Sequence, residues 1–248
     1  MIFLSLFLGL LPGFAWLVFY LSEDPHPEPK RLIALTFIAG IAFGFFTIII
    51  EQAFIGGITL AGIPTIPVIA QEIQTGAIGT FGIFELILTL LGLAFIEEFM
   101  KFSAAYFAAG KSSQLDEPVD AMIYMIVAAL GFATLENIGA ITNAAAAAAQ
   151  GTFIITAFQT ASLRFVGGTL LHSLTSAIVG YHWALGLAKK KVPHYLVAGF
   201  IAATILHATF NYLILNYADV GYSILFLLVI GFFVLNDFEK LKAEEIKA

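Results

Sequence analysis

The sequence contains no cysteine among its 248 residues. Disulfide bonds, a thiol nucleophile and thiolate metal ligands are therefore excluded, and a metal would have to bind histidine, carboxylate or amide side chains. Charged residues are also scarce, at 11% of the chain, whereas 60% of the residues are hydrophobic. Soluble domains do not have this composition. There is no glycine-rich phosphate-binding loop and no basic tract, so no nucleic-acid partner is expected.

Long apolar runs make up most of the chain. A hydrocarbon core about 30 Å thick requires roughly 20 apolar residues per helical span. Hydropathy and helix-breaking residues predict an all-α, polytopic membrane bundle of about seven transmembrane helices, at 2–21, 32–50, 81–107, 118–141, 163–188, 195–215 and 222–235. We expect a single transmembrane domain over residues 1–236, followed by a charged tail over residues 237–248.

Basic residues are confined almost entirely to one side of this predicted bundle. They follow the first, third, fifth and seventh helices as Lys30, Arg31, Lys111, Lys189, Lys190, Lys191, Lys240, Lys242 and Lys247. The positive-inside rule then places the N-terminus outside and the C-terminus in the cytoplasm. Residues 51–80 and 143–160 are expected to be outer connecting loops, with some helix in them. The alternative for them is a re-entrant or lid element, since irregular backbone at membrane depth must face protein or water.

Ionisable side chains inside the third predicted helix are the first candidates for chemistry. Each charge at the centre of a span costs about 2.5–3.5 kcal/mol on insertion scales, so such groups are usually paired or functional. Glu97 and Lys101 are four residues apart and can pair on one face. Glu98 points about 100° away. One glutamate could thus be held by the lysine while the other is left for catalysis; the alternative is an ion pair that serves only helix packing.

The next three predicted helices add further polar groups, namely Glu136 with Asn137, Arg164 with His172, and His207 with Asn211. Each group alone could be an interhelical hydrogen bond or a packing residue. Because four helices each contribute one, a bundle can gather them in a single polar cavity. Counting from the span ends, however, places Glu136 about two turns, or roughly 10 Å, from the level of Glu97.

The order of these motifs resembles the PrsW family of intramembrane proteases, which is distantly similar to the CAAX-processing and bacteriocin-immunity membrane proteases. The matching elements, over about residues 95–211, are Glu97-Glu98-x-x-Lys101, Phe132-x-x-x-Glu136-Asn137, Arg164 with His172, and His207-x-x-x-Asn211. Asp116-Glu117-Pro118-x-Asp120 also fits the family, and by itself it is typical of a helix start. The resemblance implies cleavage of a membrane-protein substrate such as an anti-sigma factor, in the cytoplasmic membrane of a prokaryote.

Two mechanisms follow from these residues, and both stay open at this stage. With zinc, His172, His207 and either Glu136 or Glu98 would be ligands, and Glu97 or Glu98 would be the base. Without metal, one of the two adjacent glutamates would activate water with a histidine, while His207 and Asn211 would stabilise the oxyanion. Lys101, Asn137 and Arg164 would support the site in either case.

Other classes of function are weaker alternatives. The chain has no His-Glu-x-x-His or Gly-x-Ser-x-Gly signature, so the usual zinc and serine motifs are absent. A non-catalytic scaffold or immunity protein would bind peptides and tolerate the loss of Glu98 and His207. A transporter would also bury charged residues, but it would predict inverted repeats, and none is convincing here.

Overall fold

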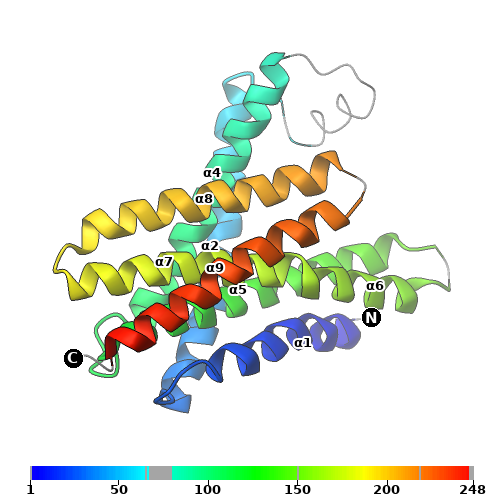
Figure 1. Ribbon diagram of the computed structural model, residues 1–248. Helices are drawn as coiled ribbons and strands as arrows, with labels where there is room; N and C mark the ends of the chain where they lie inside the picture. Colours follow the sequence, from blue (N-terminus) through cyan, green and yellow to red (C-terminus); the bar gives the residue numbers. More distant parts are fainter. Residues whose placement is uncertain (1, 65, 67–79, 150, 218, 246–248) are drawn as a thin grey trace.

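The structure is a computed structural model that describes residues 2–64, 66, 80–149, 151–217 and 219–245 (Figure 1). Within these residues the regular structure is helical and includes no strand, which confirms the all-α class. The helices are α1 (Ile2–Leu21), α2 (Lys30–Leu60), α4 (Thr80–Ala109), α5 (Pro118–Ala147), α6 (Phe153–Val166), α7 (Gly168–Ala188), α8 (Val192–Asn216) and α9 (Gly221–Glu245).

Six stretches among the described residues are long and apolar enough to cross a membrane, counting α6 and α7 as one stretch. A multi-pass membrane protein is thus supported. Helix α4 is not one of the six, and it carries the four charged residues Glu85, Glu97, Glu98 and Lys101. Large apolar side chains are exposed on the outer helices, as lipid-facing surfaces require.

Helix α5 forms the centre of the bundle. It packs against α1, α2, α4, α6, α7 and α9, and its side chains are buried from Val119 through Thr134. Small residues allow this close packing. A Cβ added at Gly40 would lie 2.0 Å from the carbonyl oxygen of Ala128, and one at Gly131 would lie 2.0 Å from that of Phe37. Helices α2 and α5 therefore cross backbone against backbone. In Figure 1, α2 and α4 run side by side across the direction of the other helices.

Several helices are longer than the sequence predicts. Helix α2 continues past residue 50 to Leu60, and α5 continues to Ala147. Much of the two expected outer loops is therefore helical, while residues 67–79 of the first loop lie outside the described part of the chain. Helix α9 continues through the boundary expected at residue 236, and Phe238 and Leu241 on its last turns are buried.

The prediction of one helix over residues 163–188 is wrong. The chain breaks at Gly167, whose φ of −107° and ψ of −98° are not helical, so that α6 ends at Val166 and α7 begins at Gly168. Consecutive glycines are a common cause of such breaks. The second glycine also makes room, because a Cβ at Gly168 would lie 2.7 Å from the guanidinium carbon of Arg164. Arg164 and His172 therefore come from two different helices rather than from one face of one helix.

Candidate active site

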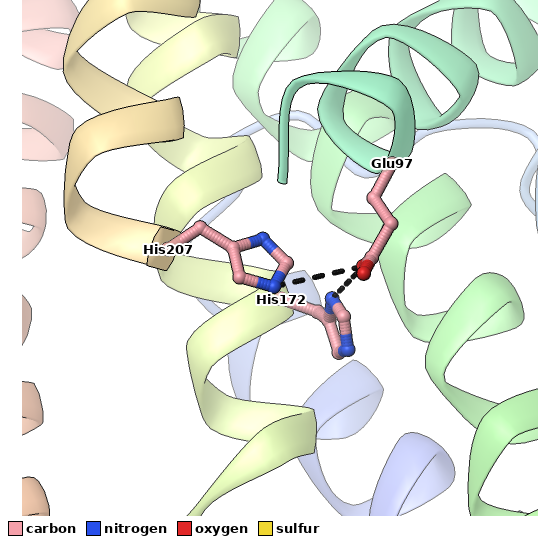
Figure 2. A group of neighbouring side chains, drawn as sticks. All are labelled: Glu97, His172 and His207. Atoms are coloured by element: carbon pink, nitrogen blue, oxygen red, sulfur yellow. Dashed lines mark ion pairs between the residues drawn. The ribbon is translucent and has the colours of Figure 1, made fainter. Parts of the chain in front are cut away.

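Three side chains from three helices converge in the interior of the bundle (Figure 2). They are Glu97 of α4, His172 of α7 and His207 of α8, and one ligand atom from each lies within 4.8 Å of the others. Glu97 Oε2 is 3.6 Å from His172 Nδ1 and 3.6 Å from His207 Nε2. All three side chains are buried. The carboxylate oxygen thus faces one nitrogen of each imidazole.

A separate carboxylate holds the second nitrogen of each imidazole. His172 Nε2 is 2.7 Å from Glu136 Oε2, and His207 Nδ1 is 2.7 Å from Glu98 Oε1. An imidazole N–H that donates to a carboxylate fixes both the ring orientation and the tautomer. The nitrogens left over, Nδ1 of His172 and Nε2 of His207, are those that face Glu97.

Glu98 is completely buried and is surrounded by donors. Besides His207, its carboxylate accepts hydrogen bonds from Lys101 Nζ at 2.9 Å, Thr175 Oγ1 at 2.9 Å and Ser176 Oγ at 3.3 Å. The ion pair expected between Glu97 and Lys101 is present at 3.5 Å, but the shorter contact of the lysine is with Glu98. Glu98 is therefore the glutamate held in place, and Glu97 is the one that faces the histidines.

A second polar network links α6 to the same cluster. Arg164 donates from Nη2 to Glu136 Oε2 at 2.8 Å and from Nε to Asn137 Oδ1 at 2.6 Å. Asn137 in turn donates to Thr169 Oγ1 at 3.0 Å. Glu136 accepts from both Arg164 and His172, so the gap in depth expected from the sequence is closed in the folded bundle.

A cavity of about 760 Å³ opens beside the cluster. Its polar lining includes Glu97, His172, His207, Asn211 and Arg164. Apolar side chains complete the wall, among them Leu90, Leu93, Ile214 and Leu227. This size and this mixture of apolar wall with a few convergent polar groups are typical of a ligand site. Asn211, also predicted from the sequence, therefore lines the same cavity as the two histidines.

Comparison with known proteins identifies the family of the chain. A family model described as PrsW family intramembrane metalloprotease matches residues 28–236. The chain belongs to the PrsW family. Protease PrsW of Geobacillus kaustophilus (strain HTA426) is 28% identical over 237 residues, covering 94% of this chain and 90% of the relative. Protease PrsW of Bacillus subtilis (strain 168) is 23% identical over 241 residues, covering 95% and 94%. No solved structure matches the chain.

The description of the PrsW family as metalloproteases implies a metal. Two imidazole nitrogens and one carboxylate, completed by water, are a common catalytic zinc set. Glu97 Oε2 is also a buried oxygen without a hydrogen-bond partner among the described residues, which calls for a ligand or water. The residues therefore fit zinc in type, with Glu97 supplying the carboxylate while Glu136 holds the outer nitrogen of His172. A bound ion would have to displace the hydrogen bond of 2.7 Å that Lys101 donates to His172 Nδ1.

Two further side chains belong to the site region of this PrsW-family chain but to none of the sequence motifs. Thr175 donates directly to Glu98, and its only signal in the sequence is the grouping of Ser173, Thr175 and Ser176 in an apolar helix. Glu51 was assigned to a loop but lies in α2, partly buried and close enough to interact electrostatically with Glu136. The extra length of α2 is what brings it there.

Proposed function

We propose that this PrsW-family protein hydrolyses a peptide bond of a membrane-protein substrate in the cavity beside Glu97, His172 and His207, within the cytoplasmic membrane. The observation that carries the proposal is Glu97 Oε2, a buried oxygen without a hydrogen bond from any described residue, held 3.6 Å from one nitrogen of each histidine at the wall of that cavity. A single-span protein such as an anti-sigma factor is the proposed substrate, because the largely apolar wall suits a segment that comes from lipid.

Glu97 is the proposed general base. A base must lie within hydrogen-bond reach of the water that it deprotonates, directly or after small adjustments on substrate binding. A water in the cavity beside Glu97 Oε2 could donate a hydrogen bond to that oxygen. Glu97 takes a proton as the water oxygen attacks the peptide carbonyl carbon, and it returns that proton to the amine nitrogen when the C–N bond breaks. Glu98 is less suited to this role because its oxygens already accept four donors.

His207 and Asn211 are the proposed oxyanion stabilisers. They are four residues apart on α8, which places them on one helix face, and both line the cavity. The amide of Asn211 can donate a hydrogen bond to the oxygen that becomes negative. The Glu98 carboxylate at Nδ1 of His207 holds the ring so that Nε2 faces Glu97 at the cavity wall. In the alternative zinc form, Glu97, His172 and His207 would be ligands instead, and the ion would supply Lewis-acid polarisation and a more acidic water.

The test is cleavage of a tagged anti-sigma factor from the same organism by the purified protein in liposomes. Glu97→Gln should lower the cleavage rate by about 10²–10⁴-fold, while Glu85→Gln, a change of the same type on the same helix, should not. Elemental analysis of the same preparations decides the role of metal. About one zinc per chain, lost in His207→Ala, would support the zinc form. Cleavage by a folded protein free of metal would support the glutamate form. A wild-type protein that folds but cleaves nothing would leave the non-catalytic scaffold as the better reading.

A further inference from the structure

A second cluster of titratable groups lies far from the active site, where α5 begins. Glu28 of the α1–α2 connection, Asp116 of the α4–α5 connection and Asp120 of the first turn of α5 each offer an oxygen within 4.8 Å of the others. Asp120 precedes Glu136 by 16 residues on the same helix, or about 24 Å of helix axis. The two clusters are therefore separate sites.

Asp120 is the most buried member of this cluster, and only one of its two carboxylate oxygens accepts hydrogen bonds from described residues. Its Oδ2 accepts the backbone N–H groups of Asp116 at 3.0 Å and Glu117 at 2.7 Å. The side chain is fully buried, yet Oδ1 has no hydrogen-bond partner among the described residues. Because helix capping occupies Oδ2, Oδ1 is the oxygen left for a ligand. A buried acceptor without a donor is costly and calls for a bound ion, proton or water.

The neighbours of Asp120 fix Glu28 beside it without neutralising it. Tyr124 donates its hydroxyl hydrogen to Glu28, and Asp24 Oδ2 accepts the backbone N–H of Glu28 at 3.3 Å. Burial raises the pKa of Glu28 above its ordinary value, and the nearby carboxylates of Asp24 and Asp116 act in the same direction. The surroundings of Glu28 therefore disfavour the negatively charged form of its own carboxyl group.

The basic side chains of the region do not supply the missing positive charge. Among the described residues, His26 pairs with Glu117 at 2.8 Å, on the rim of the cluster. No described lysine or arginine has a side-chain nitrogen within 4.0 Å of a carboxylate oxygen of Glu28, Asp116 or Asp120. Three carboxylates with one unpartnered buried oxygen and no lysine or arginine partner form a set that a small cation would satisfy.

We propose that Glu28, Asp116 and Asp120 bind one oxygen-preferring divalent cation, Mg²⁺ or Ca²⁺. Both ions are bound by carboxylate oxygens and complete their coordination with water, and the exposed position of Asp116 leaves room for water on one side. The cation ties the α1–α2 connection to the α4–α5 connection and to the first turn of α5. Since α5 is the central helix and carries Glu136, such a tie holds the start of the helix that organises the bundle.

The experiment uses the full-length protein in detergent, stripped with EDTA and exchanged into metal-free buffer. MgCl₂ and CaCl₂ are titrated separately to about 5 mM, which exceeds the dissociation constants of weak calcium sites, and thermal unfolding and calorimetric heats are recorded. At least one ion should raise the unfolding midpoint by several degrees and bind at about one per chain. The ion that binds more tightly identifies the occupant.

Variants locate the binding site. Asp116→Asn, at an exposed loop position, should weaken binding by about tenfold or more, and Asp120→Asn should do the same where it folds. Glu97→Gln at the active site should respond like wild type. Failure of wild type to bind either ion would overturn the proposal and leave a shared proton between the carboxylates. A response that persists in Asp116→Asn, or that disappears in Glu97→Gln, would also overturn it.

Discussion

Lys101 offers the sharpest test of how the active site is held together. Its side chain is completely buried, and its ammonium contacts Glu98 at 2.9 Å, His172 Nδ1 at 2.7 Å and Glu97 at 3.5 Å. It also lies 5.0 Å from the ring centroid of Phe132. Lys101→Met preserves most of the volume and removes the charge. The change leaves two neighbouring glutamates buried without their cation, which should cost about 3–5 kcal/mol of stability.

A double-mutant cycle separates the ion pair from simple packing. Glu98→Gln should also destabilise the protein strongly, because it leaves the Lys101 ammonium with a neutral amide. In the double variant both members of the pair are gone, so the loss should be smaller than the sum of the two single losses by about 1–3 kcal/mol. The same reasoning predicts that neither single variant is rescued by high salt, since buried pairs are little screened.

Unfolding midpoints in one detergent measure these losses, with Lys242→Met as the matched control. The Lys242 ammonium pairs with Glu23 at 2.7 Å, but both side chains are roughly a fifth exposed, so its loss should cost about 1 kcal/mol or less. Additive effects of Lys101→Met and Glu98→Gln would refute the reasoning. So would a Lys101→Met loss no larger than that of the control.

Three further predictions address packing, catalysis and pH. Gly40→Ala should cost about 1–3 kcal/mol, because its Cβ would overlap the Ala128 carbonyl across the α2–α5 crossing; Gly139→Ala, with nothing within 4 Å, should be nearly neutral in the same unfolding assay. Asn211→Ala should lower kcat by about 10²–10³ with little change in KM, as for an oxyanion donor; a change confined to KM would contradict that role. Because the pKa of Glu28 is raised in the folded protein, stability in EDTA should fall as pH rises above its ordinary value of 4.5, and Glu28→Gln should flatten that decline.

Buried charge was the part of the candidate site that could be predicted from the sequence. A membrane interior penalises every ionisable side chain, so the few that occur in apolar runs stand out without any structure. Glu97, His172 and His207 were found in this way, and the fold brings all three together. The prediction depended on composition and residue spacing, so it does not change when the helix boundaries are wrong by several residues.

The division of labour between the two adjacent glutamates could not be predicted. Helical geometry shows only that Glu97 and Glu98 point about 100° apart. Which of them faces the cavity depends on the rotation of α4, and that rotation is set by packing against α2, α5, α7 and α8. The break at Gly167 was hidden for a similar reason, because hydropathy runs on without interruption through α6 and α7.

The contacts of the active site form two parallel chains that end on the same carboxylate. In one, Arg164 pairs with Glu136, which holds His172; in the other, Lys101 pairs with Glu98, which holds His207. Both histidines then turn their remaining nitrogen toward Glu97.

Glu136 therefore has Arg164 as its cation, and Glu98 has Lys101. Glu97 has no cation of its own and contacts Lys101 at the longer distance of 3.5 Å. With neutral histidines, three carboxylates and two basic side chains leave one negative charge in a buried cluster. An uncompensated buried charge is costly, so the cluster favours a proton or a cation at Glu97. A group that readily takes up a proton there is what a hydrolytic base requires, and a group that takes up a cation is what a zinc site requires. The same charge imbalance thus accounts for both forms of the proposed mechanism, and the metal content of the active protein decides between them.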